Sequence, residues 1–423
     1  MRPSAKSAAA PQSGRTVAHT AFFEALGALP DGGGARWADI LAGLVTLRLV
    51  DRWARHETSS LSRTALNAVE QAICSVDVRT PLRPALNEIV EAVRGSLHRA
   101  DVDVLAAVLA YAHTLRLNAD WALATDVYQT VITAARTPGD QRLAPEAYDR
   151  LGYCLRMLGE LDRALEAYSA GHAIAIERGD TTMALRIRVS EANVSIGRGN
   201  FPAAELLLEE IVTAAYAADL PAIAALALHD RGLVAHVRGQ IERGILFYHD
   251  ALIHATDPSQ RDRLLADLGR AFGEMGARDV AREALLLLYV TGTAQVDRWV
   301  AAINLLELAA LDTQETVFEE YRRELARADL PPRYQAFYHL FVGEGCARFG
   351  RMKCALSSFH RAIKVAEEYE VNEVLVRAQT GRDAVQRHRA TPPYPAAVEV
   401  PETVAHVASA LRILREQAAA AHP

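Results

Sequence analysis

Apolar residues recur at helical spacing along most of this chain. The clearest segment is residues 148–171, YDRLGYCLRMLGELDRALEAYSAG. Its apolar side chains fall three or four residues apart on both sides of Gly159: Tyr148, Leu151, Leu155 and Leu158 before it, and Leu161, Leu165 and Tyr168 after it. This spacing predicts two antiparallel helices joined by a tight turn. Gly159 suits the turn because it can end the first helix in a left-handed conformation.

The same helix pair recurs with a nearly fixed period. Its predicted turns lie 40, 40, 40, 37, 37 and 37 residues apart, at Ala119, Gly159, Gly199, Gly239, Gly276, Thr313 and Gly350. A fixed period predicts a stacked-repeat solenoid rather than one closed core. Because the period shortens after Gly239, we expect altered curvature or a binding boundary there.

Small residues occupy the positions where the two helices of a pair approach each other. Seven residues before the turns come Ala112, Gly152, Ala192, Gly232, Gly269, Leu306 and Gly343, and five after them come Ala124, Ala164, Ala204, Gly244, Ala281, Phe318 and Ala355. Larger residues recur nine positions after most turns: Tyr128, Tyr168, Leu208, Tyr248, Leu285 and Phe359. We expect these larger side chains to fill the gap to the next pair.

This pattern resembles the tetratricopeptide repeat over about residues 104–369. The resemblance implies an all-α protein, a right-handed α-solenoid of helix hairpins. The sixth copy departs from the pattern at Leu306, Thr313, Phe318 and Arg322, so we expect it to be distorted. Two further departures are Glu191 and Arg231, which replace the large apolar residue expected eight positions before the turn. The period of 37 to 40 residues also exceeds the usual repeat of about 34.

The flanking segments are predicted to differ from the repeats. We expect residues 1–17 to be a disordered tail, 18–98 an N-terminal helical bundle or degenerate repeats that cap the stack, and 101–390 the superhelix. Residues 391–401 contain four prolines and predict an extended connector. Residues 402–423 predict a final helix and tail, and this helix either caps the last repeat or reaches a partner chain.

Composition and charge exclude several classes of protein. Half of the 423 residues are hydrophobic and only 6% are aromatic, which suits closely packed helices. The formal charge of -6 argues against a general binder of nucleic acid or anionic membranes. The polar start of the chain does not read as a signal peptide, and no apolar run approaches the roughly 20 residues of a membrane span. We therefore expect a cytoplasmic protein.

The four cysteines show no metal-type spacing. Cys74, Cys154, Cys346 and Cys354 lack any CxxC pattern, so free thiols in a reducing compartment are the simplest expectation. Cys154 and Cys346 fall within packed first helices, where we expect inert burial.

The resemblance also implies which residues could bind a partner, because the first helix of each tetratricopeptide pair lines the concave surface. Carried over to this sequence, the candidates are His113, Arg116, Asp149, Tyr153, Arg156, Arg186, Asn193, His229, His236 and Arg270, with Glu307 and Glu344 further along. Planar Arg and Asn donors can hold a peptide's backbone, terminus or acidic side chains. The alternative is a solvated face with salt bridges between neighbouring repeats. Since no lysine lies between Lys6 and Lys353, a lysine-based carboxylate clamp is ruled out.

No catalytic constellation is found. His229 and His236 share a helix face, but a two-His metal site needs a third ligand, and neither HExxH nor HxxEH occurs. Neither GxxxxGK[ST] nor GxSxG occurs, and residues 31–34 (DGGG) read as a loop because no strand precedes them. We expect no catalytic residue, no bound metal and no cofactor.

These observations favour a non-enzymatic scaffold that binds a protein or peptide in the groove of the superhelix. The alternative is a peptide-sensing regulator, since the layout resembles the bacterial regulators that join an N-terminal helical domain to similar repeats. A DNA-binding version is disfavoured because residues 18–97 show no basic recognition helix. A metal-dependent hydrolase is a third reading. The sequence does not identify the partner or the oligomeric state.

Overall fold

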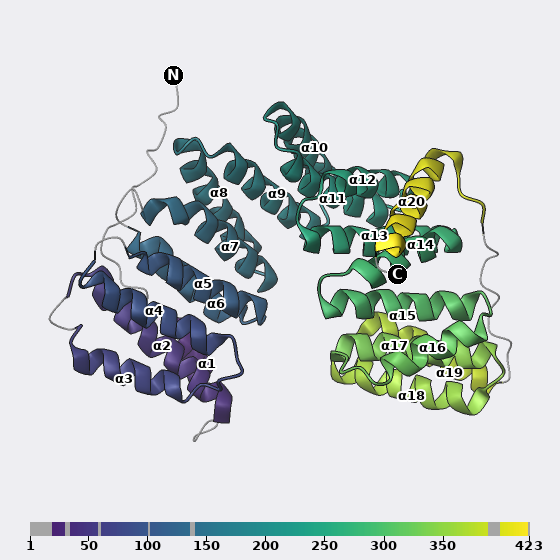
Figure 1. Cartoon of the computed structure of the whole chain (residues 1–423), viewed down its shortest axis with the longest axis horizontal. Coiled ribbons are helices and arrows are strands. Elements are labelled where there is room, and N and C mark those ends of the chain that lie inside the picture. The colour runs from purple at the N-terminus through teal and green to yellow at the C-terminus, as the bar shows by residue number, and fades with distance from the viewer. Residues whose placement is uncertain are drawn as a thin grey trace. The chain divides into compact units, whose positions relative to one another are not determined.

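The computed structural model describes residues 19–29, 34–57, 61–99, 102–135, 140–387 and 398–421. These residues form helices joined by turns, with no β-strand among them, which confirms the all-α prediction (Figure 1). The predicted N-terminal tail, the loop at 31–33 and most of the predicted connector lie outside the described residues. No helix in the described part of the chain is long and apolar enough to cross a membrane.

The chain divides into two compact units, Met1–Ala203 and Ala204–Pro423. Unit 1 contains α1 (Thr20–Gly27), α2 (Gly34–Ala54), α3 (Arg63–Cys74), α4 (Leu82–Ser96), α5 (Val104–Leu117), α6 (Trp121–Ala134), η2 (Asp140–Leu143), α7 (Ala144–Met157), α8 (Leu161–Glu177) and α9 (Thr181–Gly197). Helix α10 (Phe201–Ala217) begins at the end of unit 1 and continues into unit 2.

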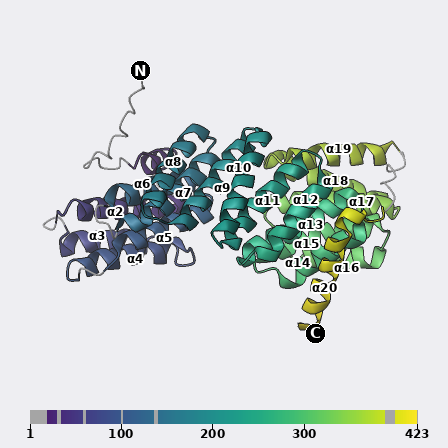
Figure 2. The ribbon, with the colours of Figure 1, turned by 90° about the horizontal axis from the view of Figure 1, so that it is seen from above.

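Unit 2 continues the series of helix pairs. It contains α11 (Pro221–Val237), α12 (Ile241–His254), α13 (Pro258–Met275), α14 (Arg278–Thr291), α15 (Gln295–Leu311), α16 (Glu315–Leu325), α17 (Pro332–Arg348), α18 (Met352–Glu368), α19 (Asn372–Gln386), η3 (Glu402–Val404) and α20 (Ala405–Ala421). Within each unit most helices pack against their neighbours in the chain (Figure 2). This sequential packing of hairpins is an α-solenoid, as predicted.

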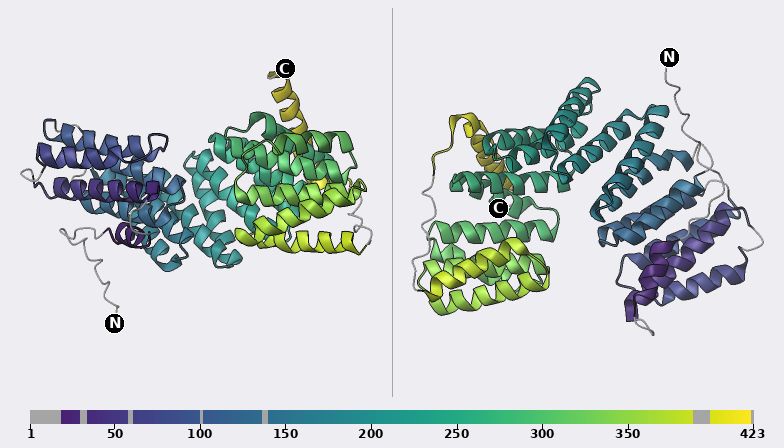
Figure 3. Two further views of the ribbon diagram at one scale, coloured as in Figure 1. Left: turned by 90° about the horizontal axis from the view of Figure 1, so that it is seen from below. Right: turned by 180° about the vertical axis from the view of Figure 1, so that it is seen from behind.

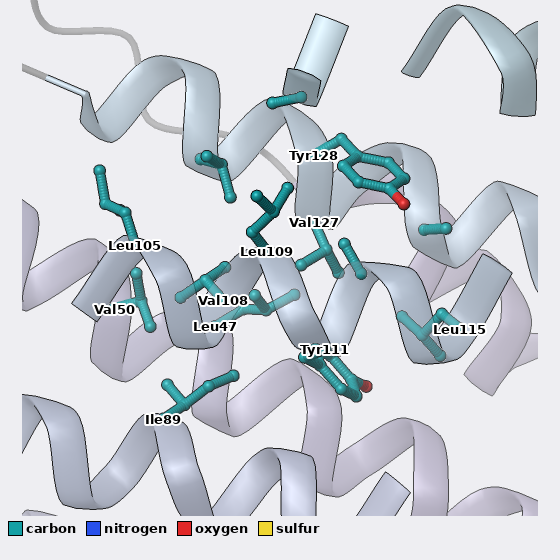
Figure 4. Packing of buried hydrophobic residues seen from close by; sticks show 14 of the residues in the cluster. Leu47, Val50, Ile89, Leu105, Val108, Leu109, Tyr111, Leu115, Val127 and Tyr128 are labelled. Carbon is teal, nitrogen blue, oxygen red and sulfur yellow. The ribbon is translucent and has the colours of Figure 1, made fainter. Parts of the chain in front are cut away.

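The N-terminal helices of unit 1 share one hydrophobic core with the first repeat pair (Figure 4). Leu47 from α2 and Ile89 from α4 pack close to Val108 from α5 and Val127 from α6, and all four side chains are fully buried. Burying such aliphatic side chains stabilises a fold by roughly 1.5–3 kcal/mol each. The core therefore runs without a break from α2 to α6.

All the predicted turns of the helix pairs adopt the left-handed conformation. The φ angles are 60° at Ala119, 80° at Gly159, 73° at Gly199, 75° at Gly239, 89° at Gly276, 55° at Thr313 and 72° at Gly350. Each turn residue therefore ends its first helix as expected. Three further left-handed turns join one pair to the next, at Gly179, Asp219 and Glu370, and each follows the preceding pair turn by 20 residues.

The change of period from 40 to 37 residues at Gly239 coincides with a shorter second helix in the pair, although the first period is also 40 residues with an α6 of only 14. Helices α8 and α10 each have 17 residues, whereas α12 and α14 each have 14. The three missing residues are close to one helical turn and equal the change in period. In the sixth copy the second helix, α16, is shorter still, at 11 residues.

Large residues nine positions after the turn pack on the small residue of their own pair. A Cβ built on Gly343 would lie 2.7 Å from Phe359 Cδ1, and one built on Gly152 would lie 2.7 Å from Tyr168 Cδ1. Phe359 also reaches Gly381 in the following helix, α19. The expectation that these side chains fill only the gap to the next pair was thus incomplete, since they first close their own hairpin.

Helix α20 is not placed where the sequence suggested. It packs against α14 and α12 in the middle of unit 2, away from α17 and α18, as Figures 1 and 3 show in yellow. Val404, Val407 and Leu411 belong to the same hydrophobic cluster as the α12–α14 core and are fully buried. The expectation that this helix caps the last repeat or reaches a partner chain is therefore wrong. The apolar stripe was predicted correctly, but it packs on other helices of unit 2.

Two of the four cysteines are joined, contrary to the expectation of free thiols. Cys346 on α17 and Cys354 on α18 form a disulfide across the Gly350 turn, with 5.9 Å between their Cα atoms. Cys154 is free and fully buried, and burial raises its pKa to about 12. Its thiol stays protonated at neutral pH, which confirms the prediction of an inert cysteine. Cys74 is free and exposed.

Candidate partner-binding faces

The first helices of unit 1, α5, α7 and α9, carry the first seven candidate residues on neighbouring positions. We call this set the first-helix face of unit 1: His113, Arg116, Asp149, Tyr153, Arg156, Arg186 and Asn193. The aromatic ring at its centre is Tyr153, which lies between two guanidinium groups. Arg116 Cζ lies 5.5 Å and Arg156 Cζ 5.2 Å from the centre of that ring. Stacking of this kind holds both arginines in place without using their hydrogen-bond donors.

Neither of these two arginines is neutralised within the described structure. No carboxylate of the described residues lies within ion-pair distance of Arg116 or Arg156, and the Nε of each is shielded from solvent without a hydrogen-bond partner. The buried hydroxyls of Tyr128 and Tyr168 lie next to these arginines, Tyr128 beside Arg116 and Tyr168 beside Arg156. A buried donor without a hydrogen-bond partner destabilises the fold. A ligand that brings a hydrogen-bond acceptor to this face would therefore bind favourably.

The charges around Arg116 and Arg156 are mainly positive. Burial lowers the pKa of His113; the nearby Glu146 opposes this shift, and the charges of Arg150, Arg116 and Arg186 add to it. His113 Nε2 lies 3.7 Å from Glu146 Oε1, its only charged partner of opposite sign among the described residues. Burial also raises the pKa of Tyr128 and Tyr168, so their hydroxyls remain protonated and able to donate.

The remaining candidates of unit 1 hold the face together. Asp149 is only 2% exposed; its Oδ1 accepts a 2.7 Å hydrogen bond from Ser190, and its Oδ2 lies 3.5 Å from Arg150 and 3.9 Å from Arg186. Asp149 is therefore a buried link between α7 and α9 rather than an open acceptor. Asn193 donates a 3.1 Å hydrogen bond from Nδ2 to the carbonyl of Val189 on its own helix.

The two histidine candidates of unit 2 lie on α11, and each pairs with a carboxylate on α13. His229 Nε2 lies 2.8 Å from Asp267 Oδ2, and His236 Nε2 lies 2.8 Å from Glu274 Oε2. Arg270 donates a 2.8 Å hydrogen bond to Asp267 and places its NH1 3.1 Å from His236 Nε2. Because one ring nitrogen cannot donate to Glu274 and accept from Arg270 at once, the His236 tautomer decides which bond forms.

The ionisable side chains of this cluster are already paired with one another. Burial alone would raise the pKa of Asp267, but the hydrogen bond and charge of His229, together with Arg270, outweigh it and lower the pKa. Asp267 therefore stays ionised and pairs with both His229 and Arg270. No group of three or more His, Cys, Asp and Glu residues within the described ranges is arranged to hold a metal ion.

Glu307 and Glu344 are also occupied. Arg377 on α19 donates to both, with its NH2 2.5 Å from Glu307 Oε1 and 2.7 Å from Glu344 Oε2. Sequence reasoning missed Arg377, Asp267 and Glu274. A signal was present: Asp267 and Glu274 follow their histidines by 38 residues, one period plus one.

Neither a family model nor a curated protein matches this chain. Two solved structures are similar to it. BtubC (BKLC) from P. vanneervenii aligns with a TM-score of 0.41 and 18% identity over 49% of this chain and 89% of that chain. The Rap conjugation gene regulator of the plasmid pLS20, in complex with the Phr peptide, aligns with a TM-score of 0.44 and 13% identity over 82% of this chain and 96% of that chain. Both scores are below 0.5, so neither likeness bears on what this chain binds.

Proposed function

We propose that this chain is a tetratricopeptide-repeat scaffold that binds an acidic peptide segment of a partner protein on the first-helix face of unit 1. The repeat assignment rests on the seven left-handed turns and the small residues seven positions before them. The single observation that carries the function is the arrangement of Arg116 and Arg156 on either side of Tyr153, with no carboxylate to neutralise them.

A carboxylate is the ligand that fits this arrangement best. A guanidinium presents its donors in one plane and pairs with a carboxylate through parallel hydrogen bonds. Both guanidinium groups lie over the ring of Tyr153, a contact that uses none of their hydrogen-bond donors. A peptide offers carboxylates on Asp and Glu side chains and at its C-terminus. The corresponding candidates of unit 2 are already paired, since Asp267 contacts His229 and Arg270, and Glu274 contacts His236.

The experiment is a peptide array probed with the full-length chain. It should carry matched peptides in which Glu replaces Gln and in which a free C-terminus replaces an amide. We expect selective binding of the acidic members, and a loss of about tenfold to 100-fold in affinity in Arg116→Ala and Arg156→Ala, because a hydrogen bond to a charged group contributes about 1.5–3 kcal/mol. Arg163→Ala is the matched control, since Arg163 is an exposed arginine on α8, outside the face, and is paired with Glu160 at the start of the same helix.

Equal binding of acidic and neutral peptides would contradict the proposal. So would a loss of affinity in Arg163→Ala as large as that in the two face variants. A bound acidic peptide also separates the scaffold from a peptide-sensing regulator. A regulator should change its radius of gyration in small-angle scattering when the peptide binds, whereas a scaffold should keep it. A hydrolase would instead require metal that co-purifies in stoichiometric amount.

A further inference from the structure

Helix α20 is packed out of chain order. It follows α19 in sequence but lies on α12 and α14, as Figures 1 and 3 show. The backbone N–H of Val398 donates a 3.2 Å hydrogen bond to the carbonyl of Gly276 at the turn between α13 and α14. Thr403 donates a 2.5 Å hydrogen bond to Glu242 on α12, and Arg415 pairs with Glu283 on α14. We call the surface that α20 covers the α12–α14 seat.

The side of α20 that faces the seat is a regular apolar stripe. Val404, Val407, Ala408 and Leu411 are buried, and Leu414 and Ala418 continue the stripe as partly buried residues. The spacing of three or four residues is that of an amphipathic helix lying in a groove. Ile413 and Arg412 point away from the seat and are exposed.

The two halves of α20 fit the seat unequally. The inward side of the first half, through Leu411, is buried, but the second half borders a cavity of about 290 Å³ that is partly open to solvent. Leucines from three helices and from α20 line much of this cavity: Leu252, Leu265, Leu287 and Leu414. The small side chain of Ala418 is the other α20 residue at its wall. The cavity opens to solvent past the exposed residues Pro258, Arg261, Thr291 and Thr293. The part of the seat beside Ala418 is therefore not covered by α20.

The polar groups at the cavity do not require a polar ligand. Asp262 Oδ2 accepts a 2.8 Å hydrogen bond from the backbone N–H of Thr293 and a 2.7 Å hydrogen bond from its hydroxyl. This carboxylate is therefore already satisfied. The hydroxyl of Thr291 donates a 2.8 Å hydrogen bond to the carbonyl of Leu287, and Arg261 is exposed to solvent. The rest of the wall is mainly apolar and suits an apolar side chain.

We propose that the α12–α14 seat is a docking site for an amphipathic helix of a partner protein, and that α20 is its resident occupant. The partner helix carries the Val and Leu stripe of α20, an arginine opposite Glu283, and a bulky apolar residue in place of Ala418. A second copy of this chain does not meet these requirements, because its α20 would bring the same alanine and leave the same cavity. This surface is distinct from the first-helix face of unit 1.

The test uses the full-length chain and fluorescent peptides with the sequence of residues 398–421. One peptide is native, one carries Ala418→Leu and one carries Leu411→Asp. The receptors are the wild-type chain and a chain with Leu411→Asp, which should release its own helix. We expect the Leu411→Asp chain to bind the Ala418→Leu peptide about tenfold more tightly than the native peptide, because each buried methylene strengthens binding about fourfold. The Leu411→Asp peptide should bind neither chain.

The wild-type chain gives the deciding measurement. It should take up the Ala418→Leu peptide at a rate that levels off with peptide concentration, because α20 must leave first. Failure of the wild-type chain to take up this peptide after a day would show that α20 is a permanent part of the fold and would overturn the proposal. Equal affinities of the native and Ala418→Leu peptides would overturn it as well.

Two further measurements keep the test decisive. If the Leu411→Asp chain does not fold, the Ala418→Leu substitution in the full-length chain replaces it, and an increase in Tm is expected because the leucine fills the cavity. A decrease in Tm would contradict the proposed fit. Light scattering of the wild-type chain should show a monomer; a dimer that exchanges α20 would make a second copy the occupant and overturn the proposal.

Discussion

Tyr168 occupies the space that a side chain on Gly152 would need. A Cβ built on Gly152 would lie 2.7 Å from Tyr168 Cδ1, closer than real Cβ atoms approach a neighbour. The tyrosine side chain is fully buried, so the ring has no empty space into which it could move. The absence of a side chain at Gly152 therefore allows α7 and α8 to close on each other.

Gly152→Ala should destabilise unit 1 although alanine is the better helix former. Overpacking of a closed core costs about 1–3 kcal/mol, more than the gain of roughly 1 kcal/mol in helix propensity. The free energy of unfolding, from urea titration followed by circular dichroism, measures the effect. Gly197→Ala is the control, since a Cβ there would meet nothing within 4 Å. Equal stability of the two variants would contradict the packing described for Tyr168.

Replacing a non-glycine residue at a pair turn with glycine should stabilise the protein. Ala119 and Thr313 have φ angles of 60° and 55°, a region that costs a residue with a Cβ roughly 1–2 kcal/mol. We expect Ala119→Gly to raise the free energy of unfolding by up to about 1 kcal/mol, after the greater entropy of glycine in the unfolded chain is subtracted. Gly159→Val, at a φ of 80°, should lower it. Thermal melts of the two variants should shift in opposite directions.

The positions of the pair turns could be predicted because their signals are local. A residue that tolerates the left-handed conformation and a small residue seven positions earlier are enough to mark Gly159 or Gly239. The turns between pairs, at Gly179, Asp219 and Glu370, were missed because they lack the second signal. The residues seven positions earlier are His172, Val212 and Ile363, none of which is small. The disulfide also had a signal that was overlooked: Cys346 and Cys354 lie four residues before and four after Gly350.

Contacts between repeats were much harder to predict. The sequence showed which face of α20 is apolar, but an apolar stripe does not say which other surface covers it. The ion pairs of His229 and His236 depend on which first helices lie side by side, and the pairing of Glu307 depends on Arg377, 70 residues later. Such long-range pairings depend on the way the repeats stack, which the period alone does not determine.

Removal of Arg377 should destabilise the end of unit 2. Burial raises the pKa of Glu307, and the charge of Arg377 and its hydrogen bond to Glu307 oppose that shift. In Arg377→Gln the two carboxylates of Glu307 and Glu344 would lose both hydrogen bonds, and only the charge of Arg348 would remain to offset Glu307. We expect a loss of about 1–3 kcal/mol, since Arg377 is partly exposed and water screens part of the effect. Restoration of stability by Glu307→Gln in the same chain would identify the uncompensated charge as the cause.

His339 should make the stability of unit 2 depend on pH. Burial, assisted by the charge of Arg361, lowers the pKa of this histidine from 6.5 to about 4. The unfolded chain therefore binds a proton at His339 below about pH 6.5, while the folded chain does not bind it until about pH 4. The contribution of neutral His339 to stability is fully present above pH 6.5 and falls as the pH decreases from 6.5 to 4.

This effect can be isolated with two variants on α17 and α18. His339→Gln cannot take up a proton, so its Tm should decrease less than that of the wild type between pH 6.5 and 4.5. His360→Gln is the control, because His360 is an exposed histidine on α18. Carboxylates that titrate in the same range affect all three proteins alike, so they cancel in the comparison. If wild type and His339→Gln lost Tm in parallel, the burial of His339 would not be the source of the pH dependence.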